Sequence, residues 1–105
     1  MDALKAAPEH HVCLFENEHV RVIETVVPRG HKTGVHTHRY PGSQYILTWS
    51  HFIRRDHEGT VQHDSREFEP VAHESAHWIA ATAPHTVENI GDQDLRVITV
   101  ELKNT

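Results

Sequence analysis

Residues 30–38 read GHKTGVHTH and place two imidazoles two positions apart, shortly after two glycines. Residues two apart on a strand point to the same face, so we expect the side chains of His36 and His38 to share one direction. Gly30 and Gly34 permit the sharp entry that a barrel corner requires. The segment therefore predicts half of a metal site on a short strand.

A third ligand has to come from a different strand, because two imidazoles alone rarely hold a divalent ion. His85 is well placed for this role, since Pro84 and the small residues of the segment 80–83 precede it. Asn89, four residues further on, is expected to close the following turn with its side chain. The His-x-His pair and His85 are thus the candidate ligands of one divalent metal ion.

Alternation of apolar and polar residues with period two runs through much of the remaining chain. It predicts strands at 20–27, 44–52, 60–66, 77–81 and 95–102, with a further N-terminal strand around 12–15. Turn signals separate these segments, and no amphipathic helix stands out between them. Short strands at such intervals predict an all-β sandwich or barrel.

The bulk composition fits one small domain. The chain has 105 residues, close to the commonest domain size, and its 37% hydrophobic and 24% charged residues are enough for it to fold. Residues 1–9 are polar and end in Pro8-Glu9, so we expect a flexible N-terminal tail, with the domain spanning residues 10–105.

Charge and cysteine content exclude several classes of protein. The formal charge of -5, with scattered Lys and Arg, argues against a nucleic-acid partner. No apolar run approaches the ~20 residues that cross a bilayer, so no membrane partner is expected. The single cysteine, Cys13, cannot form an internal disulfide and is expected to be buried. With no signal-peptide pattern at the N-terminus, we expect a cytoplasmic location.

Two groups of residues resemble the two motifs of the cupins. The first comprises Gly30, His36-Thr37-His38 and Tyr45-Ile46-Leu47, and the second comprises Pro84-His85 with Asn89 and Gly91. The resemblance spans residues 19–102 and points to a small, single-domain cupin of the bacterial, RmlC-like type. It implies a jelly-roll β-barrel that binds one Fe, Mn, Ni or Zn ion through three histidines and a glutamate. His36, His38 and His85 would be those histidines.

The glutamate of that motif is missing, because its position falls on Gly42 or Ser43. Gln44 shares the face that this ligand would occupy, and its carbonyl oxygen can coordinate a hard or borderline cation. The predicted site is therefore either three histidines plus water or three histidines plus Gln44.

A neutral histidine site leaves coordination positions open, which suits a bidentate substrate and dioxygen on Fe(II). This resembles the three-histidine cupin dioxygenases and predicts a metal-dependent oxidoreductase acting on a small polar molecule. The alternative is a non-catalytic module that binds a small ligand or a metal. Small cupins are usually dimers, and exposed edge strands favour self-association, so we expect a homodimer in which the strand at 12–15 crosses over.

The sequence contains a second histidine motif, which is typical of zinc proteases. Residues 73–77 read HESAH, the zinc-protease pattern, which requires a helix so that the two histidines share a face. Pro70 precedes it and a strand at Trp78-Ile79 follows at once, leaving no room for such a helix. We therefore reject the protease hypothesis. Six further histidines are expected to be solvated: His10, His11, His31, His51, His57 and His63.

Overall fold

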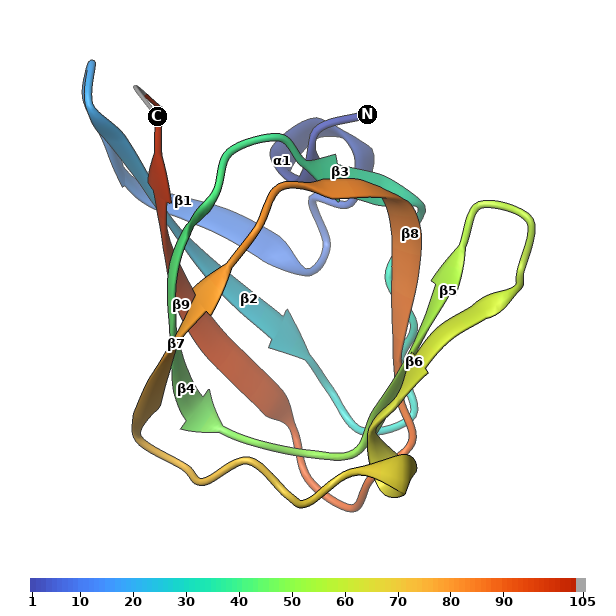
Figure 1. Cartoon of the computed structure of the whole chain (residues 1–105). Coiled ribbons are helices and arrows are strands. Elements are labelled where there is room, and N and C mark those ends of the chain that lie inside the picture. The colour runs from blue at the N-terminus through green and yellow to red at the C-terminus, as the bar shows by residue number, and fades with distance from the viewer. Residues whose placement is uncertain (104–105) are drawn as a thin grey trace.

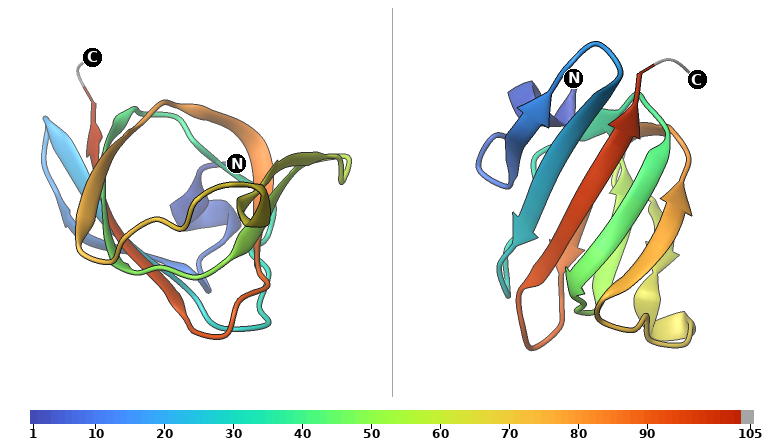
Figure 2. Two further views of the ribbon diagram at one scale, coloured as in Figure 1. Left: turned by 60° about the horizontal axis from the view of Figure 1, so that its bottom comes forward. Right: turned by 90° about the vertical axis from the view of Figure 1, so that its left-hand side faces the viewer.

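Two antiparallel sheets form a barrel in the computed structural model, which describes residues 1–103 (Figure 1). The strands are β1 (His11–Glu16), β2 (Val20–Val27), β3 (His36–His38), β4 (Gly42–Thr48), β5 (Phe52–Asp56), β6 (Val61–Asp64), β7 (Ser75–Ile79), β8 (Thr82–Asn89) and β9 (Leu95–Leu102). One sheet has the order β1-β2-β9-β4-β7 and the other β3-β8-β5-β6. Figure 2 shows the strands enclosing a common interior. The predicted all-β barrel is confirmed.

β2 and β9 are neighbouring strands within the larger sheet, and both have the bounds that the alternation predicts. Their register runs without interruption from Val20 opposite Leu102 to Val27 opposite Leu95. The inward positions change character along this ladder: Val27 faces Leu95 at one end, whereas Arg21 faces Glu101 at the other. The barrel therefore has an apolar end and a polar end.

The apolar end holds the hydrophobic core. Its buried cluster consists of Val27, Ile46, Trp49, Leu95 and Val97, with Phe52, Val71 and Val87 packed against it. Each such side chain contributes roughly 1.5–3 kcal/mol when fully removed from water. This cluster holds the two sheets together and leaves the polar end available for other side chains.

The single strand predicted at 44–52 is wrong, because the chain changes sheets within it. β4 ends at Thr48 and β5 begins at Phe52, and the segment between them turns the barrel corner. Side chains satisfy the backbone groups released there: Gln93 donates to the carbonyl of Trp49 at 2.7 Å, and the N–H of Phe52 donates to Ser65 at 2.8 Å. A corner with its hydrogen bonds met by side chains cannot be seen in an alternation pattern.

The strand predicted at 77–81 begins two residues earlier, as β7. His85 lies on a separate strand as expected, but the sequence analysis gave no bounds for this strand, β8. The turn after β8 behaves as expected. The Asn89 amide donates to the carbonyls of Val27 and Gln93 at 2.8 Å, and its oxygen accepts from Ser50 and from the N–H of Gly91. Asn89 therefore closes this turn, as its motif predicts.

The first nine residues pack against the barrel, where the sequence suggested a flexible tail outside it. Helix α1 (Ala3–Ala6) lies at the end where β3 runs, and Ala3 and Ala7 are buried. A helix of this length is not stable on its own, so tertiary contacts must hold it. Asp2 both caps the helix and forms an ion pair with Arg21.

No helix in residues 1–103 is long and apolar enough to cross a membrane.

Candidate metal centre

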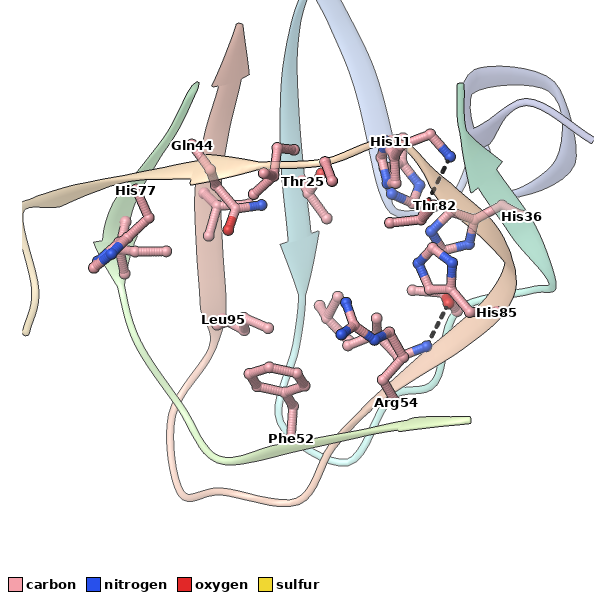
Figure 3. A pocket seen from close by; sticks show the side chains of 18 of the residues that line it. His11, Thr25, His36, Gln44, Phe52, Arg54, His77, Thr82, His85 and Leu95 are labelled. Atoms are coloured by element: carbon pink, nitrogen blue, oxygen red, sulfur yellow. Dashed lines mark hydrogen bonds between the residues drawn. The ribbon is translucent and has the colours of Figure 1, made fainter. Parts of the chain in front are cut away.

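The three histidines that the sequence selects lie together at the polar end of the barrel. β3 pairs with β8 so that His36 is directly opposite His85, and their ring centroids are 4.5 Å apart. The His36 and His38 rings, on the same face of β3, are 5.1 Å apart. Figure 3 shows His36 and His85 side by side at one end of the cavity. The shared direction predicted for the His-x-His pair is confirmed.

His11 joins this group, although the sequence analysis assigned it to solvent. It is the first residue of β1 and only 4% exposed, with its ring 4.5 Å from His36 and 5.4 Å from His38. One ring nitrogen from each of His11, His36 and His38 lies within 4.8 Å of the others. His85 lies outside this group, with its ring centroid 4.5 Å from that of His36 and 5.9 Å from that of His38. Two nitrogens bound to one ion at about 2.0–2.1 Å lie roughly 3–3.5 Å apart, so binding an ion would draw these rings closer together. The prediction of a solvated His11 is wrong, and so is that for His10, which is also buried.

All four rings are held in the same tautomer by their Nδ1 atoms. The partners are backbone carbonyls for three of them: Ala7 for His11 at 2.9 Å, Gly34 for His36 at 2.8 Å and Ala83 for His85 at 2.8 Å. The fourth, His38, has a carboxylate oxygen of Glu101 at 3.0 Å. Since these oxygens only accept, each Nδ1 carries the ring proton and each Nε2 offers a lone pair. This is how histidines that bind metals are oriented.

Burial also keeps three of the rings neutral: those of His11, His36 and His85. Burial lowers the pKa of His36 to about 3 and that of His11 to about 4, although hydrogen bonds to backbone carbonyls act in the opposite direction. Burial lowers the pKa of His85 as well. Neutral imidazole is the form that binds a metal, so these rings need lose no proton at neutral pH.

Glu101 is a fully buried carboxylate that connects His38 to a network of charges. It accepts from Arg21 Nε at 3.0 Å and from Nη2 at 2.7 Å. The same guanidinium donates to both oxygens of Asp2 at 3.0 and 2.7 Å. Hydrogen bonds to Asp2 raise the pKa of Arg21; burial opposes this, and Glu101 adds to the rise. The network fixes the orientation of His38 and ties helix α1 to the site.

Gly42, one of the two positions where the motif glutamate is expected, has no room for a side chain. A Cβ at this position would lie 1.9 Å from the carbonyl oxygen of Val100, so no side chain fits without moving β9. In the ladder between these strands, Gly42 is directly opposite Glu101. The carboxylate of this site therefore comes from the neighbouring strand, and it acts through His38.

Gln44 lines the same cavity, which has a volume of about 880 Å³. Its amide nitrogen lies 3.5 Å from Thr99 Oγ1. Figure 3 shows it across the cavity from His36 and His85, beside His77. The structure thus brings His11, rather than Gln44, to the three predicted histidines.

The zinc-protease pattern at 73–77 forms no helix. β7 begins at Ser75, and His73 accepts from the backbone N–H of Trp49 at 3.1 Å, while His77 contacts Ser75. The rejection of the protease hypothesis is confirmed, because the two histidines do not share a helical face.

Comparison with known proteins identifies the fold. No protein-family model and no curated protein matches the chain. A cupin domain from Bordetella pertussis Tohama I has a TM-score of 0.70 at 21% identity, over 89% of this chain and 91% of that one. An RmlC-like cupin with a double-stranded β-helix fold from Methanocaldococcus jannaschii has a TM-score of 0.61 at 15% identity, covering 88% and 77%. The polyketide cyclase RemF from Streptomyces resistomycificus has 0.61 at 20% identity, covering 96% and 71%.

The chain therefore has the fold of a small cupin, and its polar end carries a group of three histidines, His11, His36 and His38, that could hold a metal ion. The resemblance stated from the two sequence motifs is confirmed at the level of the fold.

Proposed function

We propose that this protein binds one divalent transition-metal ion through the Nε2 atoms of four histidines. His36, His38 and His85 are the ligands that the sequence predicts, and His11 takes the place that we had assigned to water or Gln44. The observation that carries the proposal is the set of four Nδ1 hydrogen bonds, all to acceptor oxygens. A group of buried histidines held in one tautomer has no evident use for packing alone.

The donor set narrows the choice of ion. Imidazole nitrogens suit iron, nickel and zinc, whereas manganese prefers carboxylate and water oxygens. The sequence analysis expects Fe, Mn, Ni or Zn. A nitrogen-only site therefore favours Fe, Ni and Zn over Mn. Glu101 adds negative charge next to His38 and makes that ring a stronger donor.

The proposed activity is that of a metal-dependent oxidoreductase of the dioxygenase type, acting on a small molecule inside the barrel. When bound, the ion supplies dioxygen activation if it is iron, or polarisation of a substrate oxygen if it is zinc. The chain itself supplies a cavity with an apolar wall, including Trp49, Phe52 and Leu95, against which the apolar part of a substrate can pack. Gln44 and Thr25 offer hydrogen bonds to polar groups of a substrate.

Metal content of the untagged protein, measured by mass spectrometry, tests this proposal. We expect about one ion per chain, either as purified or after reconstitution with Fe(II), Mn(II), Ni(II) or Zn(II). If the ion is iron, oxygen uptake with small candidate substrates tests the dioxygenase activity. A loaded protein that consumes no dioxygen supports the non-catalytic alternative. A protein that stays empty with all four ions contradicts the proposal.

Homodimerisation through β1 is a second proposal. Val12, Leu14 and Phe15 on this edge strand are each more than half exposed. Cys13, which we expected to be buried, is exposed there too, because both faces of β1 are open. A second copy of the chain that pairs with this edge would cover these apolar side chains. Light scattering on the eluting protein is expected to give twice the chain mass of 12.0 kDa, and a monomer would refute the idea.

The cytoplasmic location stays a prediction.

A further inference from the structure

Arg54 is an arginine whose side chain lies inside the barrel. It lies on β5 with Phe52 on the same face, and both line the cavity. Figure 3 shows its side chain reaching into the cavity between Phe52 and His85. Among the residues that the structure describes, none forms a hydrogen bond or an ion pair with this guanidinium.

The neighbouring residue, Arg55, is an arginine with a structural role in the same strand. Arg55 points to the other face of β5 and donates to Glu88 at 2.7 Å. Burial lowers the pKa of Arg54, and no carboxylate counteracts that effect. An unpaired, partly buried charge costs stability, so its presence calls for a partner that is not part of the chain.

The surroundings of Arg54 indicate the sign and shape of that partner. None of the described residues that line the cavity is acidic, whereas Arg54 places a positive charge in it. The overall charge of the chain is negative, so this interior differs in sign from the molecule as a whole. Beside Arg54 lies the apolar wall formed by Val27, Trp49 and Leu95 together with Phe52.

We propose that Arg54 binds the carboxylate of a small organic acid whose apolar body packs against this wall. A planar guanidinium binds a carboxylate with two parallel hydrogen bonds, which fixes its orientation as well as its position. The ligand lies in the cavity that holds the histidine cluster. As a statement about substrate class, the inference rests on the proposed function; as a statement about binding, it does not require the metal.

Calorimetric titration with phenylacetate and its uncharged analogue phenylacetamide tests the inference, both without metal and with added Zn(II). In the metal-free protein, we expect phenylacetate to bind the wild type more tightly than phenylacetamide does. Arg54→Met is expected to weaken phenylacetate binding roughly tenfold to a hundredfold, the loss of a charge-assisted pair, and to leave phenylacetamide unaffected. Arg55→Met, which removes only the outer ion pair, is the matched control and should bind phenylacetate like the wild type.

Thermal unfolding of the same variants separates a binding role from a structural one. Because Arg54→Met removes an unpaired charge from a partly apolar site, we expect its melting temperature to equal or exceed that of the wild type. A clear decrease would make Arg54 a structural residue and overturn the inference. So would equal phenylacetate binding by wild type and Arg54→Met, or no binding of phenylacetate, benzoate or hexanoate to the wild type.

The metal-free and metal-loaded titrations keep the two proposals apart. Arg54-dependent binding in a protein that retains no metal supports the carboxylate site and contradicts the metal centre. If the protein retains one metal ion per chain but phenylacetate binds wild type and Arg54→Met equally, the result supports the metal centre and contradicts the carboxylate site.

Discussion

Replacing Arg21 with methionine is expected to lower the free energy of unfolding of the metal-free protein by about 3–5 kcal/mol, the cost of leaving one charge of a buried pair alone. Arg21 is the main partner of Glu101, whose side chain is 0% exposed, and it also donates twice to Asp2. Methionine has a similar length and fills the space, but within residues 1–103 it leaves His38 as the only donor to the Glu101 carboxylate. Since a domain is typically stable by only 5–15 kcal/mol, the effect should be large.

Urea denaturation of three variants measures this. Arg96→Met is the matched control, because Arg96 pairs with Glu24 at 3.1 Å across an exposed part of the same two strands. Such surface pairs contribute about 0–1 kcal/mol. The double variant Arg21→Met with Glu101→Gln should recover part of the loss, since it removes the uncompensated carboxylate. If Arg21→Met costs no more than Arg96→Met, the buried network does not stabilise the fold.

The alternation pattern was a good guide to those parts of the fold and site that depend on neighbouring residues alone. It predicted the bounds of β2 and β9, and the two-residue spacing of His36 and His38 predicted their common direction. His85 could be selected because its motif has a local signature of small residues and a proline. These features require only that side chains alternate along a strand.

His11 could not be recognised from the sequence because its role depends on tertiary structure. Its Nδ1 partner is the carbonyl of Ala7 at the end of α1, a helix too short to be predicted from propensity. Its position next to His36 results from how β1 and β3 meet at the polar end. Nothing in the sequence around residue 11 distinguishes such a histidine from a solvated one.

Glu101, unlike His11, has a feature in the sequence from which its buried position could be predicted. It lies in phase with Leu95, Val97 and Thr99, the inward positions of β9, where a charged residue is unexpected. Arg21 has the same phase in β2. An acidic and a basic residue, each on the buried face of an adjacent strand, predict a buried ion pair. The motif glutamate is expected in β4, whereas the carboxylate of this site comes from the neighbouring strand, β9.

Replacing His36 with alanine is expected to lower the affinity for the metal more than about a hundredfold, because even losing a hydrogen-bond partner of a ligand typically costs 10–100-fold. His36 is the most central of the four rings: its centroid lies 4.5 Å from His11, 4.5 Å from His85 and 5.1 Å from His38. Removing it separates the ligands on β1 and β8 from one another. Competition with a chromophoric chelator gives the dissociation constant for each variant.

Two companion variants determine whether the loss reflects coordination. His77→Ala removes a histidine that lines the same cavity but lies beside Gln44, across from the cluster, and it should bind the metal like the wild type. Glu101→Gln leaves all four rings in place and weakens only the donor strength and orientation of His38, so its affinity should fall between the other two. The order His77→Ala, Glu101→Gln, His36→Ala, from tightest to weakest binding, is what a four-histidine centre supported by a buried carboxylate requires. Equal affinities in all three would place the ion elsewhere, and a larger loss in His77→Ala than in His36→Ala would move it to the Gln44 side of the cavity.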